Sequence, residues 1–202
     1  MGEWTYGKSI RRYVHTSNRP LTIRLQTTTA LTLLYRNMSY IPFNQLPPHA
    51  RLWVFAADRA LSEAESMQLT AEASAFVDRW TAHNQSLLAS ADLRYDRFLM
   101  IAVDEATAGA SGCSIDELYR RIRTLGETFG VNFMNNMMVF FRNAQGNITA
   151  SSREAFSEQA SPETMVFDNS ITSVQAISNW EVPAKESWHI GLIRPIQATT
   201  TK

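Results

Sequence analysis

The chain has 202 residues, 45% of them hydrophobic, and a formal net charge of zero. This length and composition allow one globular domain with a substantial core. No apolar run approaches the roughly 18 residues that a membrane-spanning helix needs, so we expect no membrane span. The single cysteine, Cys113, excludes an intramolecular disulfide and favours a cytoplasmic location.

Charge is unevenly distributed along the chain. Residues 1–37 contain six Lys and Arg residues against Glu3 alone, a net charge of +5, which leaves the remainder at −5. The net negative charge of residues 38–202 argues against general affinity for nucleic acid. We expect 1–37 to be a disordered leader or a misassigned start, with translation beginning at Met38. Residues 38–195 then form a single α+β domain, and 196–202 a disordered tail.

Four segments have strand patterns. Apolar runs at 51–57 (RLWVFAA), 98–103 and 137–142 predict buried strands, and the alternation at 91–95 predicts a strand with one wet face. A tight turn near residues 96 and 97 joins two of them. Residues 145–147 predict a hairpin turn after the last strand.

Two long helices are predicted between these strands. The first runs over 63–82, opened by a capping box of Ser62 and Glu65. The second is opened by a capping box of Ser114 and Glu117 and ends at Gly130.

The order of these elements is strand, helix, strand, strand, helix, strand. This βαββαβ order is typical of the ferredoxin-like, split βαβ arrangement, in which two helices cover one face of an antiparallel sheet. After the C-terminal hairpin we expect helical appendages, near 151–160 and 168–178. The pattern leaves the oligomeric state open.

The stretch 98–117 (FLMIAVDEATAGASGCSIDE) is the best candidate for a site. Two acids follow a buried strand, and a loop of small residues leads into a helix N-terminus, where backbone N–H groups can converge on a bound group. We expect the loop 108–114 to bind a small anionic ligand or a protein partner. The predicted ligand-binding residues are Asp104, Glu105, Gly109, Ser111, Gly112, Ser114 and Asp116.

The cysteine suggests an alternative, a transferase or hydrolase. Cys113 precedes a predicted helix, whose dipole lowers the pKa of a thiol, and His83 and His189 are the candidate bases. The competing interpretation is that Cys113 is a small buried residue in a tight turn. Histidine and cysteine spacings match no metal motif, so we expect no metal and no cofactor.

Two segments match or resemble nucleotide-binding motifs. Residues 2–9 (GEWTYGKS) fit the phosphate-loop pattern, but no strand precedes them to position the loop, which argues against that function. The run LMIAVDE is similar to a Walker B strand, and DEATAGAS resembles the matching stretch of ABC-type ATPases. A parallel nucleotide-binding sheet would need a different element order.

Three short motifs together carry a family resemblance: WTAH at 80–83, SGCSID at 111–116 and SWH at 187–189. With these motifs the chain resembles a family of small uncharacterised bacterial proteins often labelled automatically as ABC transporter ATPase. The resemblance covers about 38–193. The resemblance implies a cytosolic setting. The label of that family adds one more alternative function, an ABC-type ATPase-related protein, but the family brings no established activity, substrate or cofactor.

Overall fold

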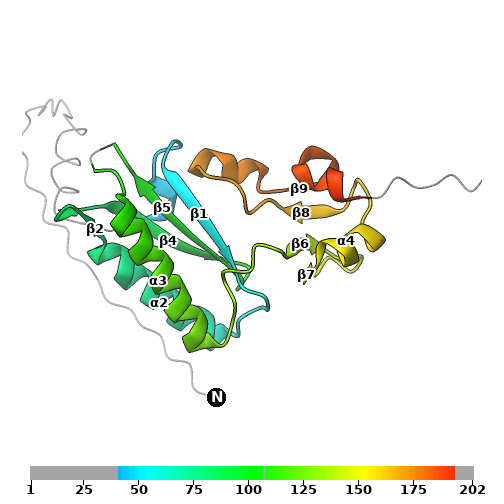
Figure 1. Cartoon of the computed structure of the whole chain (residues 1–202), viewed down its shortest axis with the longest axis horizontal. Helices are drawn as coiled ribbons and strands as arrows, with labels where there is room; N and C mark the ends of the chain where they lie inside the picture. The colour runs from blue at the N-terminus through cyan, green and yellow to red at the C-terminus, as the bar shows by residue number, and fades with distance from the viewer. Residues whose placement is uncertain (1–40, 107, 194–202) are drawn as a thin grey trace, which may run out of the picture.

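The computed structural model describes residues 41–106 and 108–193 (Figure 1). The predicted leader 1–37, the start at Met38 and the tail 196–202 lie outside the described residues. Within the described part of the chain, no helix is long and apolar enough to cross a membrane.

The first sheet has the strand order β1-β5-β4, with both neighbouring pairs antiparallel. Its strands are β1 (Arg51–Ala56), β4 (Leu88–Arg94) and β5 (Phe98–Asp104). The central strand β5 is buried from Phe98 through Val103, as its uninterrupted apolar run predicts. Alternate β5 side chains belong to two different hydrophobic clusters, one on each face of the sheet.

Helices α2 (Glu63–Arg79) and α3 (Gly112–Phe129) pack on one face of this sheet (Figure 1). The predicted capping box of α2 is confirmed, with Ser62 and Glu65 bonding each other's backbone N–H. Its predicted end at residue 82 is wrong. The chain leaves the helix at Trp80 and forms the short antiparallel hairpin of β2 (Thr81–Ala82) and β3 (Gln85–Ser86).

The start of α3 differs from the sequence prediction, and its end agrees with it. Ser111, not Ser114, is the N-cap, and its hydroxyl accepts the Ser114 N–H at 3.3 Å. Ser114 lies inside the first turn and is buried. Gly130 ends the helix in the left-handed conformation, with φ of 60°, as predicted.

A second sheet packs against the opposite face of β5 through a shared apolar cluster. Its antiparallel order is β7-β6-β8-β9. Its strands are β6 (Val139–Arg142), β7 (Ile148–Ser151), β8 (Met165–Phe167) and β9 (Glu181–Pro183). The appendages are the helix α4 (Arg153–Gln159) and the 3-10 segments η1 (Phe43–Gln45), η2 (Val174–Asn179), η3 (Ala184–Glu186) and η4 (Trp188–Leu192).

The protein is therefore α+β with antiparallel sheets, as expected, but the ferredoxin-like topology is not confirmed. The strand predicted to complete the first sheet, β6, pairs with β7 and β8 instead. Beside β1 lies a short extended segment, where the Leu52 N–H donates to the Thr172 carbonyl at 2.9 Å. In the second sheet β6 buries both faces, with Phe140 in one apolar cluster and Phe141 in another.

Candidate functional site

The predicted anion loop uses its own acids to satisfy its backbone donors. The Asp104 carboxylate accepts the Ala106 N–H at 3.0 Å, and the Glu105 carboxylate accepts the Ala110 N–H at 3.1 Å. A bound anion would have to displace the Glu105 carboxylate to reach the Ala110 donor. The geometry therefore favours a self-contained turn over an anion cradle.

Two basic side chains lie near these acids. His49 Nε2 is 3.6 Å from Asp104 Oδ1, and Arg51 Nη1 is 3.6 Å from Glu105 Oε1. A Cβ built on Gly109 would lie 4.0 Å from Glu105 Oε1, and one built on Gly112 would have open space around it. The predicted residues lie at the end of β5, in the described part of the following loop and in the first turn of α3, where Asp116 is exposed.

Cys113 is exposed in the first turn of α3, which overturns the interpretation that it is a small buried residue. His83 lies at the exposed tip of the turn between β2 and β3, with a positive φ of 51°. His189 lies in η4, in the layer of the second sheet. Among the described residues, no hydrogen bond joins the Cys113 thiol to either histidine, so the catalytic hypothesis stays a prediction without an observed base.

The surroundings of His189 fit a structural role. Its side chain is 2% exposed, its Nδ1 is 2.9 Å from Ser187 Oγ, and its ring stacks on Trp188 with 3.9 Å between centroids. Burial lowers the pKa of His189, against the opposing charge of Asp168, and the Arg153 cation lowers it further. Burial in this aromatic contact therefore favours the neutral imidazole. In the described ranges, no group of three or more His, Cys, Asp or Glu residues could hold a metal ion.

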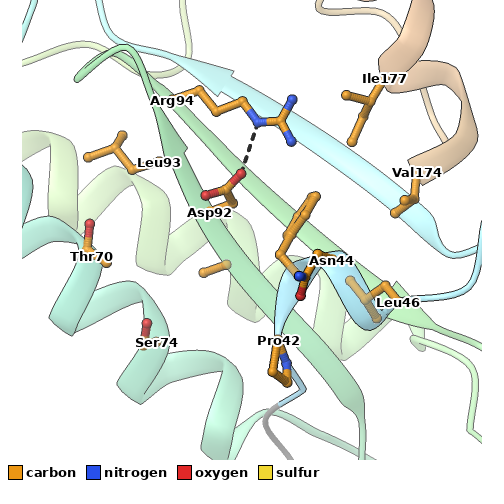
Figure 2. Close-up of a pocket in the computed structure, with 12 residues that line it drawn as sticks. Pro42, Asn44, Leu46, Thr70, Ser74, Asp92, Leu93, Arg94, Val174 and Ile177 are labelled. Carbon is orange, nitrogen blue, oxygen red and sulfur yellow. Dashed lines mark hydrogen bonds and ion pairs between the residues drawn. The ribbon is translucent and has the colours of Figure 1, made fainter.

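A cavity of about 610 Å³ lies at the outer edge of β4, and we call it the β4 cavity (Figure 2). Its volume falls within the usual range for small-molecule sites, about 300–1,000 Å³. The apolar part of its lining is Pro42, Phe43, Leu46, Ala91, Leu93, Val174 and Ile177. The polar part is Asn44, Thr70, Ser74, Asp92 and Arg94.

Strand alternation places the polar groups of the cavity. Asp92 and Arg94 are two residues apart on β4 and share one face, while Leu93 points to the other face, towards α2 (Figure 2). Thr70 and Ser74 are four residues apart on α2, so their hydroxyls lie on one side of that helix. The cavity therefore extends around the strand edge and meets both layers of the molecule.

In the β4 cavity, the ion pair of Arg94 and Asp92 engages only some of the hydrogen-bonding atoms of the two side chains. Arg94 Nε donates to Asp92 Oδ2 at 2.9 Å, and the guanidinium lies 5.8 Å from the ring centroids of both Phe43 and Trp180. Within the described part of the chain, neither Nη atom of Arg94 has a hydrogen bond, and neither does Asp92 Oδ1. The bond through Nε orients the guanidinium, and its outer donors have no partner among the described residues.

Sequence reasoning detected these residues without recognising a site. The alternation of charged Asp92 and Arg94 with apolar neighbours predicted a strand with one exposed face. The strand is confirmed, but Asp92, Leu93 and Arg94 are all half-buried, so the exposed face is not. Phe43, Thr70 and Val174 come from three distant segments, and no local pattern brings them to that face. The usable signal was a pair of opposite charges two residues apart on one strand face.

The chain matches no family model, no curated protein and no solved structure, so the site is interpreted from its own geometry.

Proposed function

We propose that this protein binds a small molecule carrying a carboxylate in the β4 cavity, with Arg94 as the anion-binding residue. The observation that carries this proposal is the guanidinium of Arg94, anchored through Nε and without a hydrogen bond to described residues at its Nη atoms. A guanidinium presents parallel N–H donors that match the two oxygens of a carboxylate.

The lining of the cavity supports an amphiphilic ligand. Phe43, Leu46 and Ile177 offer apolar contact, worth about 25 cal/mol for each Å² of apolar ligand surface removed from water. Asp92 fixes the Arg94 side chain before the ligand arrives, which reduces the conformational entropy lost on binding.

This proposal keeps the expected ligand class and moves the site away from the loop 108–114. The Glu105 carboxylate already takes the Ala110 donor in that loop, whereas Arg94 has donors to spare. We also infer a cytoplasmic location from the lone cysteine, and kinship with the bacterial family carrying the WTAH, SGCSID and SWH motifs. The ferredoxin-like arrangement also remains a proposal, supported by the strand order β1-β5-β4 and by the packing of α2 and α3 on one face of that sheet.

A protein partner at the loop 108–114 is the second candidate. It is favoured by a hollow of about 510 Å³ beside the loop, lined by Cys113, Asp116, Tyr119, Arg120 and Arg123. Tyr119 is 36% exposed there, and aromatic and arginine side chains are enriched at protein interfaces.

The test of the carboxylate site is calorimetric titration with 4-methylpentanoate and with its neutral amide, 4-methylpentanamide. We expect the acid to bind and the amide to bind at least about tenfold more weakly, because a charge-assisted hydrogen bond contributes roughly 1.5–3 kcal/mol. Arg94→Gln should weaken the acid to a similar extent. Arg79→Gln, on the exposed surface of α2 and outside the cavity, is the matched control and should change nothing. Equal affinity for acid and amide would contradict the proposal.

A further inference from the structure

The outer edge of β4 has few backbone partners among the described residues where it lines the β4 cavity. β4 pairs with β5 on its inner side, and on its outer side the Ile41 N–H donates to the Ala89 carbonyl at 3.4 Å. Backbone groups of alternate residues in a strand point to the same side. The N–H and C=O groups of Ala91 and Leu93 therefore also point outward, and no described residue bonds them.

Among the described residues, the chain pairs with this edge only at its beginning. Ile41 makes one bond to the edge, and Pro42, which follows, has no N–H to continue the pairing and leads into η1. No described residue continues the pairing beyond Ala89, so this part of the edge can accept an added strand. Ala91 and Leu93 both line the cavity that contains Arg94.

We infer that the ligand of the β4 cavity is the carboxyl-terminal end of an extended peptide, which adds to β4 as a strand and places its terminal carboxylate on Arg94. This inference rests on the proposed function. A peptide backbone carries donors and acceptors in the alternation that a strand edge offers, and such edge addition is a common mode of peptide recognition.

The free edge and the charges define the length and chemistry of this peptide. From Ala91 to Leu93 the edge spans about 7 Å, which accommodates about three residues of extended chain. Alternate side chains of the peptide would face Leu93 and α2 on one side and Ile177 on the other (Figure 2), where Phe43 also lies, near Arg94. This lining favours apolar residues. The cation at Arg94 favours a free carboxylate over an amide at the end.

The test uses an N-acetylated tripeptide of valine, leucine and valine with a free carboxylate, titrated into the full chain by calorimetry. Two matched peptides are titrated beside it: one with a terminal amide, and one N-methylated at the central residue, which removes a backbone donor. We expect each change to weaken binding at least about tenfold. The tripeptide acid should bind more tightly than 4-methylpentanoate, which lacks backbone amides.

A variant of the protein tests the same backbone pairing. Ala91→Pro removes an outward N–H and leaves the ladder to β5 intact, because the Ala91 N–H does not face β5. It should weaken the tripeptide about tenfold more than it weakens 4-methylpentanoate, which has no backbone amide to pair with the edge. If this variant does not fold, the N-methylated peptide decides the question.

The outcomes separate the two proposals. Binding of 4-methylpentanoate that depends on Arg94, together with equal affinity for the N-methylated and unmodified tripeptides, would overturn the peptide inference and leave the carboxylate site standing. Failure of every carboxylate to bind, or binding indifferent to Arg94→Gln, would overturn both.

Discussion

Arg59 joins the beginning of α2 to the end of α3. Its guanidinium donates to both carboxylate oxygens of Glu65, at 3.0 and 2.8 Å, and to the Phe129 carbonyl at 2.7 Å. The carbonyl lies at the negative end of the α3 dipole, where a cation is stabilising. One side chain thus satisfies a terminal carbonyl of one helix and orients the capping glutamate of another.

This arrangement predicts a pH-dependent contribution of Glu65 to stability. The hydrogen bond from Arg59 and the Ser62 N–H lower the pKa of Glu65 from 4.5 to about 2. A lowered folded-state pKa stabilises the fold above the unfolded value and loses that effect as pH falls through the folded value. Glu65→Gln should therefore reduce the free energy of unfolding at pH 7, and the difference from wild type should shrink as the pH approaches 2.

Urea denaturation at a series of pH values measures this dependence. Glu63→Gln is the control, because Glu63 is also an acid in the first turn of α2 but has no ion pair with described residues. If the difference in free energy of unfolding between Glu65→Gln and wild type stayed constant from pH 7 to pH 3, the lowered pKa of Glu65 would be contradicted.

At the scale of elements, α3 ends in a tight reversal that depends on Gly126. The Val131 N–H donates to the Gly126 carbonyl at 2.9 Å, with Gly130 between them in the left-handed conformation. A Cβ on Gly126 would lie 2.7 Å from the Val131 carbonyl oxygen. The glycine therefore allows the chain to pass close to its own helix.

We predict that Gly126→Ala lowers stability even though alanine favours helix by roughly 1 kcal/mol over glycine. The backbone contact cannot be relieved by a side-chain rotation, and overpacking of this kind costs about 1–3 kcal/mol. Gly112→Ala is the matched change in the same helix, where a Cβ meets nothing within 4 Å, and it should be neutral or stabilising. Thermal unfolding of both variants checks the pair, and equal melting temperatures would contradict the prediction.

At the scale of the whole molecule, aromatic residues join the two sheets. The Phe98 ring of β5 lies 4.8 Å from the ring of Phe167, 4.9 Å from Trp180 and 5.4 Å from Phe140, measured between centroids. Nearby, the Tyr95 hydroxyl donates to Glu181 at 2.8 Å across the same boundary. These contacts predict that the two sheets unfold together.

Phe98→Ala should cost about 3–5 kcal/mol of stability and lower the protection of both sheets from hydrogen exchange. The side chain is 0% exposed, so its loss leaves a cavity between the sheets. Met137→Ala, at a residue that is 66% exposed, should change stability by less than about 0.5 kcal/mol. Loss of protection in the second sheet alone, with β5 unchanged, would show that the sheets are independent units.

The sequence alone determined the local elements. The apolar run of β5, the Ser62 and Glu65 capping box and the end of α3 at Gly130 were all predictable, because strand period, capping and helix termination depend on residues a few positions apart. The start of α3 was predicted at Ser114, but the N-cap is Ser111. Either serine can cap a helix, and only the path of the preceding loop selects between them.

Only the tertiary structure decided which strands share a sheet and which side chains share a site. β6 has the same apolar pattern whether it completes the first sheet or joins a second one, and its pairing is settled by distant aromatic partners of Phe140 and Phe141. The placement of Cys113 on α3 and of His189 in η4, and the contact of Arg94 with Phe43, likewise depend on long-range packing. Such contacts join residues far apart in the chain, and no local periodicity encodes them.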